Sequence, residues 1–257
     1  MVIQEKYDGQ SGTGYRPVPA RALRVHLLQD VTDLKVTEAD VLAGIKSGEP
    51  IATNGNQGSI HVCNVGDQRV IIKEATGWGL AGALRRWTLR REYNNYQRLQ
   101  NVNGIPRCYG LIGGRYLVLQ LIDGQTLRHA TIEDRTVFFE QLLAIIASIH
   151  GHGVAHGDLM RKENTLVSHD QRPYLIDFGV SVVRKPGFHP INHFWHGFLQ
   201  QLDLNAWVKH KYQRKLENMS PEDARLYRPT RLERMARAVK ARWVKLKRSV
   251  VGSGKST

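Results

Sequence analysis

The stretch that decides the fold runs from Ile149 to Ser181 and reads IHGHGVAHGDLMRKENTLVSHDQRPYLIDFGVS. It holds an H-G-D-L sequence with Asp158, an asparagine at position 164, and an apolar run that ends in I-D-F-G with Asp177. Apolar residues next to each motif predict short strands, so the polar residues would lie on loops at strand ends. Two carboxylates and an amide in this order suit phosphoryl transfer. One carboxylate orients a hydroxyl and accepts its proton, while the other carboxylate and the amide hold Mg²⁺ against phosphate groups.

The composition is typical of a globular chain with an anionic partner. Of the 257 residues 41% are hydrophobic, and two cysteines outside any C-x-x-C pattern favour a reducing, cytoplasmic setting. The N-terminal residues lack the apolar core of a secretory signal, and no run approaches the ~18 apolar residues of a membrane span. The net charge of +14 indicates an anionic partner, but nucleic acid, anionic lipid and a phosphorylated substrate all stay open.

A glycine-containing turn and a lysine-bearing strand precede the deciding stretch. Gly55 and Gly58 lie between two strand-like runs, where backbone N–H groups can approach phosphates because no Cβ intervenes; an ordinary Asn-Gly hairpin turn is the alternative. The strand-like run Val70–Lys73 follows, and Glu92 lies nineteen residues after the lysine in a helical pattern. A lone lysine and a lone glutamate are usually solvated. Found in this order upstream of both motifs, they predict a functional ion pair.

These motifs together resemble those of the protein-kinase-like superfamily over residues 51–183, about half of the chain. The resemblance implies that Asp158 is the catalytic base that positions the acceptor hydroxyl, and that Asp177 binds Mg²⁺ together with Asn164. It further implies that Lys73, held in place by Glu92, contacts the phosphates of ATP.

The same resemblance implies an ATP site between two lobes. Gly55 and Gly58 match the second and third glycines of the kinase loop G-x-G-x-x-G-x-V, whereas Thr53 replaces the first glycine. A hinge between the lobes would contact adenine through its backbone, and Gln120 and Ile122 lie there. ATP and Mg²⁺ are therefore the expected cofactors.

The motifs depart from the family pattern at two positions. The family places the metal-binding asparagine five positions after the catalytic aspartate, whereas Asn164 is six positions after Asp158 and Glu163 stands in the expected place. An asparagine followed by an apolar strand resumes at residue 164, so we favour a one-residue bulge with Asn164 as ligand; Glu163 as a substitute ligand stays open. Gly157 replaces the arginine that docks a phosphorylated activation loop in regulated protein kinases, so no such switch is expected.

The expected fold is α+β: a two-lobed protein-kinase-like fold with a reduced, mostly helical C-terminal lobe. No A-P-E sequence follows the I-D-F-G motif. This resembles the compact branch of RIO-type kinases, aminoglycoside phosphotransferases and bacterial kinases of lipopolysaccharide core sugars. We expect a partly disordered N-terminal extension, a small lobe, a large lobe and a basic helical C-terminal segment. Their ranges are 1–50, 51–122, 123–219 and 220–257.

Three further features carry alternatives. Asp203 in an apolar helical pattern either braces the catalytic loop, as an aspartate does in the kinase family, or is an exposed helix residue. Residues 231–248 predict a basic amphipathic helix, which either lies on an anionic membrane surface or docks on the large lobe. A metal site made by His150, His152 and His156 is disfavoured, since the resemblance implies that His156 braces the loop from within the core.

The function expected from these residues is transfer of the γ-phosphate of ATP to a hydroxyl, with Mg²⁺. The favoured acceptor is a bacterial lipopolysaccharide core sugar, because of the reduced large lobe, Gly157 and the basic residues 231–248. A Ser/Thr protein kinase of RIO type is the alternative, and a small-molecule kinase is third. A pseudokinase or RNA-binding module is the alternative of another class, although no feature argues strongly for nucleic acid. The protein would be cytoplasmic or peripheral on the inner membrane face.

Overall fold

The computed structural model describes residues 34, 36–47, 49–54 and 58–229, with the backbone alone at 49–54 and 58. Gly55 and residues 231–248, to which the sequence assigned a phosphate loop and a basic helix, lie outside the described residues. No helix in the described ranges is long and apolar enough to cross a membrane.

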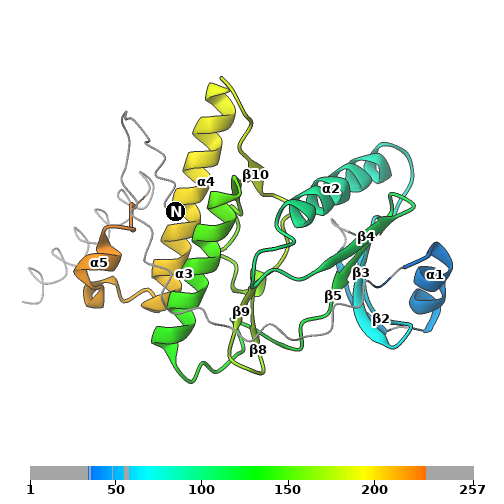
Figure 1. The fold of residues 1–257 in the computed structure, drawn as a ribbon, viewed down its shortest axis with the longest axis horizontal. Helices are drawn as coiled ribbons and strands as arrows, with labels where there is room; N and C mark the ends of the chain where they lie inside the picture. The colour runs from blue at the N-terminus through cyan, green and yellow to red at the C-terminus, as the bar shows by residue number, and fades with distance from the viewer. Residues whose placement is uncertain (1–33, 35, 48, 55–57, 230–257) are drawn as a thin grey trace, which may run out of the picture. The chain divides into compact units, whose positions relative to one another are not determined.

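The first half of the described chain forms an antiparallel five-stranded sheet with one helix on each face (Figure 1). The strand order is β1-β2-β3-β5-β4. The strands are β1 (Glu49–Asn54), β2 (Gly58–Val65), β3 (Gln68–Glu74), β4 (Cys108–Ile112) and β5 (Tyr116–Gln120). The helices are α1 (Glu38–Ser47) and α2 (Gly79–Arg98). A hairpin turn at Gly113 and Gly114 joins β4 and β5, and both glycines have positive φ.

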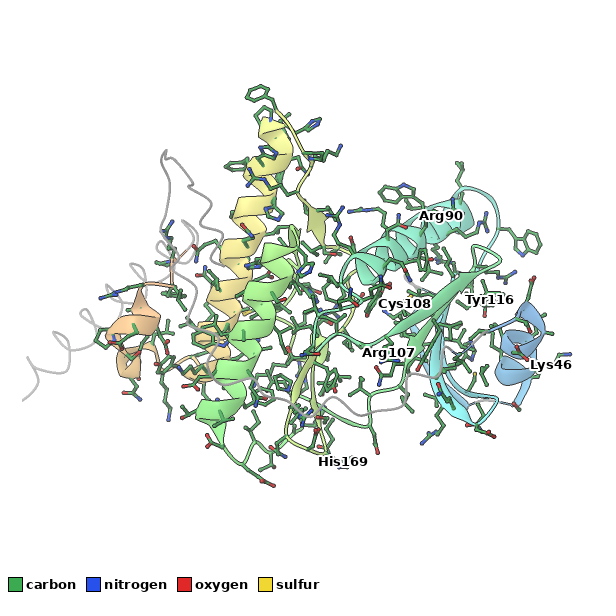
Figure 2. The ribbon with its side chains drawn as sticks, viewed as in Figure 1. Lys46, Arg90, Arg107, Cys108, Tyr116 and His169 are labelled. Atoms are coloured by element: carbon green, nitrogen blue, oxygen red, sulfur yellow. The ribbon has the colours of Figure 1, made fainter. Side chains whose placement is uncertain are left out.

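The alternation of side chains in the central strands explains why both faces of this sheet are covered. In β3, Val70 and Ile72 pack with Val41 of α1, whereas Ile71 between them packs on the opposite side with the core that includes Leu89 of α2. Side chains two positions apart in a strand share a face. Lys73 therefore follows Ile71 onto the face covered by α2. Figure 2 shows the side chains that fill the space between the sheet and this helix.

The second half of the described chain is mostly helical. Helices α3 (Arg135–Gly151) and α4 (Pro190–Lys211) lie side by side, and α5 (Pro221–Ala224) follows (Figure 1). Two small antiparallel sheets accompany them, with orders β6-β8-β9 and β10-β7. Their strands are β6 (Gly124–Thr126), β7 (Val154–Ala155), β8 (Thr165–Ser168), β9 (Pro173–Leu175) and β10 (Val182–Val183). The 3₁₀ turns are η1 (Lys162–Asn164) and η2 (Leu216–Asn218).

Helix α3 begins after a capping aspartate. The carboxylate of Asp134 accepts a hydrogen bond from the backbone N–H of Val137 at 3.0 Å, which satisfies one of the donors left open at a helix start. The apolar face of α3 packs into the main core through Phe138, Leu142, Ile145, Ile146 and Ile149. Burying such a side chain stabilises the fold by roughly 1.5–3 kcal/mol relative to exposure. This face therefore fixes the helix that leads into the loop with the H-G-D-L sequence.

The architecture is the expected α+β arrangement of an antiparallel sheet with helices followed by a mostly helical part. The division of the chain at residues 50, 122 and 219 stays a prediction. Helix α1 lies before residue 51, and its Val41 packs into the core cluster that contains Cys63 and Val65 of β2.

Candidate active site

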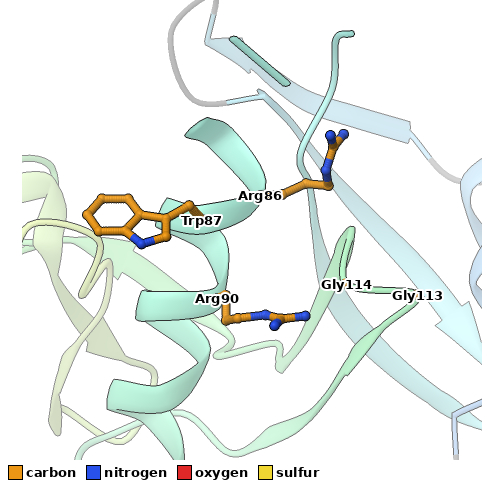
Figure 3. Close-up of a pocket in the computed structure, with 5 residues that line it drawn as sticks. All are labelled: Arg86, Trp87, Arg90, Gly113 and Gly114. Carbon is orange, nitrogen blue, oxygen red and sulfur yellow. The ribbon is translucent and has the colours of Figure 1, made fainter. Parts of the chain in front are cut away.

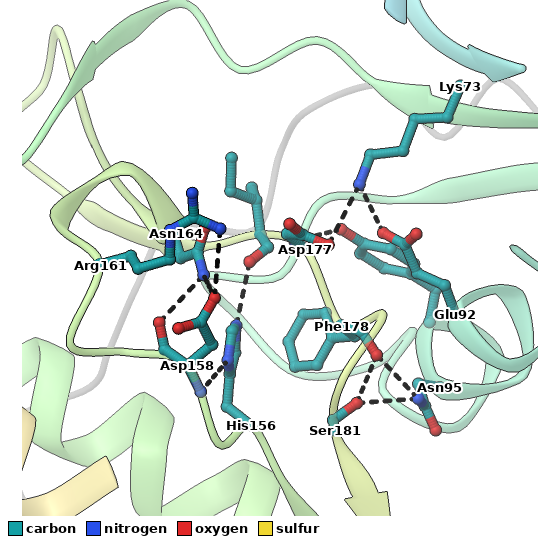
Figure 4. A network of polar contacts seen from close by, with 12 residues as sticks. Lys73, Glu92, Asn95, His156, Asp158, Arg161, Asn164, Asp177, Phe178 and Ser181 are labelled. Carbon is teal, nitrogen blue, oxygen red and sulfur yellow. Dashed lines mark hydrogen bonds and ion pairs between the residues drawn. The ribbon is translucent and has the colours of Figure 1, made fainter. Parts of the chain in front are cut away.

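The side chains of Lys73, Glu92 and Asp177 meet between the sheet and the I-D-F-G loop (Figure 4). The ammonium of Lys73 donates to a Glu92 carboxylate oxygen at 2.6 Å and lies 3.7 Å from a carboxylate oxygen of Asp177. Strand β3 supplies the lysine, and α2 supplies the glutamate from a buried position. The ion pair predicted from nineteen-residue spacing is thus present in the structure.

The two carboxylates keep Lys73 charged in a largely buried place. Burial by itself lowers the pKa of a lysine, but the negative charges of Glu92 and Asp177 outweigh it and raise the pKa of Lys73 above its ordinary value. A fixed ammonium between two carboxylates, one of them on the I-D-F-G loop, is suited to hold an anionic group such as a phosphate.

Asp158 and Asn164 lie together on the loop after β7. The side-chain N–H of Asn164 donates to the Asp158 backbone carbonyl at 3.0 Å and to its carboxylate at 3.1 Å. Arg161 approaches the same carboxylate at 3.7 Å. Because the amide nitrogen of Asn164 faces Asp158, its amide oxygen stays available as a ligand for a hard cation.

Glu163, the alternative metal ligand, points to a different partner. Its carboxylate pairs with the guanidinium of Arg128. The pKa of Glu163 is lowered, mainly by a backbone hydrogen bond and then by the hydrogen bond from Arg128. Asn164 is buried beside Asp158, whereas Glu163 is not. The short 3₁₀ turn η1 absorbs the extra residue, so the arrangement favours Asn164; ligation itself stays a prediction.

His156 braces this loop from within the core. It is fully buried, and its ring lies 4.8 Å from the ring of Phe178. Its Nε2 is 3.0 Å from the carbonyl oxygen of Ile176, and its Nδ1 faces the backbone N–H of Asp158 at 3.4 Å. A carbonyl only accepts, so Nε2 carries the proton and Nδ1 accepts. The histidine therefore links the H-G-D-L and I-D-F-G loops.

Asp203 of α4 holds the backbone of the H-G-D-L loop. Its fully buried carboxylate accepts from the N–H groups of His156 and Gly157, both at 2.8 Å, and contacts Nε2 of His150 at 3.0 Å. Of the two alternatives that the sequence left open, the structure therefore shows the brace. Sequence alone offered no means of choosing, because an aspartate in a helix is equally common on an exposed face.

Gly157 occupies a position that a side chain fits poorly. Its φ is +81°, and an added Cβ would lie 3.1 Å from a methyl group of Leu199. Positive φ is costly for residues with a Cβ. The glycine in place of the kinase arginine thus also reflects the close approach of α4.

Helix α2 holds the I-D-F-G loop through residues that the sequence analysis missed. The hydroxyl of Tyr96 accepts from the backbone N–H of Asp177 at 3.2 Å, and its ring packs edge-on against Phe178 at 5.2 Å. The amide of Asn95 donates to the Phe178 carbonyl at 3.2 Å and to the Ser181 hydroxyl at 2.8 Å. No local pattern marks these two residues, because their partners lie more than eighty positions away.

The residues assigned to nucleotide binding are placed only in part. Gly58 begins β2, opposite Asn54 of β1, and residues 55–57 lie outside the described residues. Gln120 ends β5, and its side-chain oxygen accepts from the backbone N–H of Arg107 at 3.1 Å. Ile122 follows in the connection to β6. The contacts between adenine and the backbone at Gln120 and Ile122, which the kinase resemblance implies, stay predictions.

The oxygen donors of the cluster fit a magnesium ion that is completed by phosphates. Within the described ranges, no three His, Cys, Asp or Glu side chains are grouped as a self-sufficient metal site. Mg²⁺ is commonly bound by one or two carboxylates with substrate phosphates and water. Asp177 and the free amide oxygen of Asn164 are donors of that kind, and Lys73 adds the positive charge that phosphates require.

A separate pocket of about 320 Å³ lies between α2 and the β4–β5 turn (Figure 3). It is lined by Arg86, Trp87, Arg90, Gly113 and Gly114. Arg90 points toward the glycine turn in Figure 3, and none of the lining residues belongs to the cluster described above. The pocket therefore has no part in the chemistry inferred for Lys73 and Asp158.

One arginine of α2 takes a structural role. Arg91 donates to the carbonyl of Ser181 at 3.1 Å, and its guanidinium lies 4.7 Å from the centre of the Trp87 ring. Arg91 therefore adds another tie between α2 and the segment after the I-D-F-G motif.

Comparison with known proteins identifies the same part of the chain. Residues 77–193 match the RIO domain family, a range that includes Glu92, Asp158, Asn164 and Asp177 and begins after Lys73. Serine/threonine-protein kinase RIO2 of Caenorhabditis elegans is 35% identical over 97 residues, covering 37% of this chain and 18% of that protein.

Two other relatives are also serine/threonine kinases. Probable serine/threonine-protein kinase fnkB of Dictyostelium discoideum is 31% identical over 101 residues, or 35% of this chain and 19% of its own length. Serine/threonine-protein kinase PknD of Mycobacterium tuberculosis is 32% identical over 108 residues, which cover 38% of this chain and 16% of that protein. The chain thus spans less than a fifth of each of these three relatives. The matches confirm the resemblance inferred from the ordered motifs.

Proposed function

We propose that this chain, which has the fold and ordered motifs of the protein-kinase-like superfamily, is a Mg²⁺-dependent kinase that transfers the γ-phosphate of ATP to a serine or threonine hydroxyl. The observation that carries the proposal is the meeting of Lys73, Glu92 and Asp177 next to the loop that holds Asp158 and Asn164. Kinase families use a nucleotide and a divalent metal in general, and the RIO match supports such use here.

Each residue of the cluster has a distinct part in the proposed reaction. Lys73, fixed by Glu92, binds phosphate oxygens, and Asp177 and Asn164 hold the metal that, when bound, offsets negative charge on the phosphates. Asp158 orients the acceptor hydroxyl and accepts its proton as the new oxygen–phosphorus bond forms. The bond from the γ-phosphorus to the bridging oxygen breaks, and ADP leaves with that electron pair. Most of the rate gain comes from positioning and charge stabilisation.

A protein acceptor is better supported than the lipopolysaccharide core sugar that the sequence analysis favoured. The matched family is the RIO domain, and the three relatives described above are named as serine/threonine kinases. No match described above supports a lipopolysaccharide acceptor. The preference therefore moves to the alternative, a Ser/Thr kinase of RIO type.

The test is transfer of radiolabelled phosphate from ATP with Mg²⁺ by the full chain. The acceptors are the protein itself, a protein mixture and deacylated lipopolysaccharide core. Label on Ser or Thr that is lost in Asp158→Asn and Asp177→Asn supports the proposal. Asp67→Asn, an exposed residue of the β2–β3 turn, is the matched control and should keep wild-type transfer.

Other outcomes decide between the remaining functions. Label on the lipopolysaccharide core alone would contradict the protein acceptor while keeping the phosphotransferase. ATP binding with no transfer to any acceptor would refute the kinase and leave the pseudokinase. Binding of RNA that is independent of Asp158 and weakens steeply with salt would favour an RNA-binding module.

The cellular compartment stays a proposal from cysteine chemistry. Cys63 and Cys108 are free, and burial raises the pKa of the Cys108 thiol to about 11. Disulfides are rare in the reducing cytoplasm, so two free cysteines are compatible with that compartment. We propose cytoplasmic localisation, which fractionation of the source cells would test.

A further inference from the structure

The start of α4 exposes an unusual number of large apolar side chains. They range from 40% exposure at Phe198 to 90% at Phe188. The set is Phe188, Ile191, Phe194, Trp195 and Phe198. Single exposed apolar residues are common, but five within eleven positions form a patch, and such patches mark interaction sites. We call these five residues the α4 aromatic patch.

Helix geometry brings the members of the patch together. Residues 191, 194, 195 and 198 follow the i, i+3, i+4, i+7 spacing of one helix face. The Trp195 ring makes edge-to-face contacts with Phe194 at 5.9 Å and with Phe198 at 5.8 Å. His196, on the other side of the helix, is buried. The patch is thus a continuous apolar face with no covering element among the described residues.

The loop before α4 is tied down, so the patch is presented in a defined way. The amide of Asn192 donates to the Val183 carbonyl at 3.0 Å, and its oxygen accepts from the Lys185 N–H at 2.8 Å. The ring of His193 contacts the Lys185 carbonyl at 2.9 Å. Pro190 begins the helix, where a proline is well tolerated. Phe188 therefore projects from an anchored turn.

The segment that carries the patch has charged side chains of one sign only. No acidic residue occurs between Asp177 and Asp203. Arg184 and Lys185 are both exposed in the loop that carries Phe188. The whole chain has a net charge of +14. An apolar surface with cations beside it is complementary to a layer that is anionic outside and apolar within.

We propose that the α4 aromatic patch, together with Arg184 and Lys185, docks on the surface of an anionic lipid membrane. The aromatic rings would enter the headgroup region, and the two cations would contact lipid phosphates. Shape favours a bilayer over a folded partner. In Figure 1 the first turns of α4 extend past the end of α3, and in Figure 2 side chains splay outward around that end. A projecting convex end can enter a fluid interface, whereas a protein partner would need a matching concave surface.

Docking would place the candidate active site close to the membrane. Helix α4 carries Trp195 in the patch and Asp203 against the catalytic loop. Eight residues of helix span about 12 Å. An acceptor held near the bilayer surface would therefore be within reach. The docking itself does not depend on the proposed kinase activity and is measured without ATP.

The test is sedimentation of the full chain with vesicles, either of phosphatidylcholine alone or with added phosphatidylglycerol. The wild type should bind the anionic vesicles and release them as salt screens the charges. The Phe188→Ser/Phe194→Ser variant should bind at least about tenfold more weakly. The Arg184→Glu/Lys185→Glu variant should lose most of its preference for anionic vesicles.

The matched control removes equal apolar exposure elsewhere. Leu80 and Leu84 of α2 are exposed to a similar degree, so Leu80→Ser/Leu84→Ser should bind vesicles like the wild type. Three results would overturn the proposal. The first is that the wild type does not bind vesicles, and the second is that the Leu80/Leu84 control loses as much binding as the Phe188/Phe194 variant. The third is that the Phe188/Phe194 variant binds vesicles fully. That third result would assign the binding to another segment, such as the basic residues 231–248. Self-association that the same variant abolishes, with no vesicle binding, would assign the patch to a second copy instead.

Discussion

Replacing Asp203 by asparagine should weaken both the stability and the activity of the protein. The carboxylate accepts two backbone N–H groups at 2.8 Å and contacts His150 at 3.0 Å, with no exposure to solvent. Asparagine keeps the shape but turns one acceptor oxygen into a donor. That NH₂ group would face a backbone N–H, so one buried donor loses its partner.

The magnitude follows from the hydrogen bonds that the substitution removes. A hydrogen bond to a charged acceptor contributes about 1.5–3 kcal/mol, and a buried unsatisfied donor costs about 1–3 kcal/mol. We expect Asp203→Asn to lower the free energy of unfolding by roughly 3 kcal/mol. With a urea dependence of about 2 kcal/mol per molar, the unfolding midpoint falls by about 1.5 M. A displaced catalytic loop should also reduce phosphate transfer by about 100-fold.

The assay is urea unfolding followed by circular dichroism, paired with transfer of labelled phosphate under conditions where the variant is folded. Asp67→Asn on the surface is the control and should change stability by less than about 0.5 kcal/mol. If Asp203→Asn unfolds at the same urea concentration as this control, the hydrogen-bond argument is wrong. If it is less stable but transfers phosphate normally when folded, Asp203 stabilises the lobe without positioning the loop.

The remaining predictions concern the ion pair, one glycine and one histidine. Lys73→Met should abolish phosphate transfer. It should also destabilise the fold by about 3 kcal/mol in the urea assay, because Glu92 is left buried and unpaired. Adding Glu92→Gln should restore much of the stability but none of the transfer activity. Gly157→Ala should cost roughly 1–3 kcal/mol, measured as a lower thermal midpoint, because its φ is +81°; an unchanged midpoint would contradict the strain argument. Burial lowers the pKa of His210, whose Nε2–H donates to the Leu159 carbonyl at 2.8 Å. As the pH falls, the histidine of the unfolded chain therefore binds a proton before that of the folded protein does. The free energy of unfolding should thus decrease as the pH drops below about 6.5. His210→Gln should flatten that pH dependence in urea titrations, and an equally steep curve would exclude His210 as a source.

Several parts of this protein could be predicted from its sequence because the information is local or ordered along the chain. The strand-like run Val70–Lys73 lies within β3, and Glu92 lies in a helix, α2, as its sequence pattern predicted. The glycine turn, the lysine, the glutamate and the two aspartate motifs occur in the order typical of kinases. That order was enough to indicate the kinase-like arrangement, since each motif is recognised from a short run of neighbouring residues. The acceptor could not be predicted in this way, because Gly157 and the basic residues 231–248, which favoured a core sugar, form no sequence motif that identifies an acceptor.

Other parts were decided only when distant segments met. Asn164 and Glu163 are neighbours in sequence, and the Arg128 partner of Glu163 together with the turn η1 determines which of them lies beside Asp158. The brace by Asp203 joins residues nearly fifty positions apart. The tie between Tyr96 and Asp177 spans 81 positions. A hydrogen bond needs a matching donor and acceptor within about 3 Å, and only packing of α2 and α4 around the core brings such pairs to that distance.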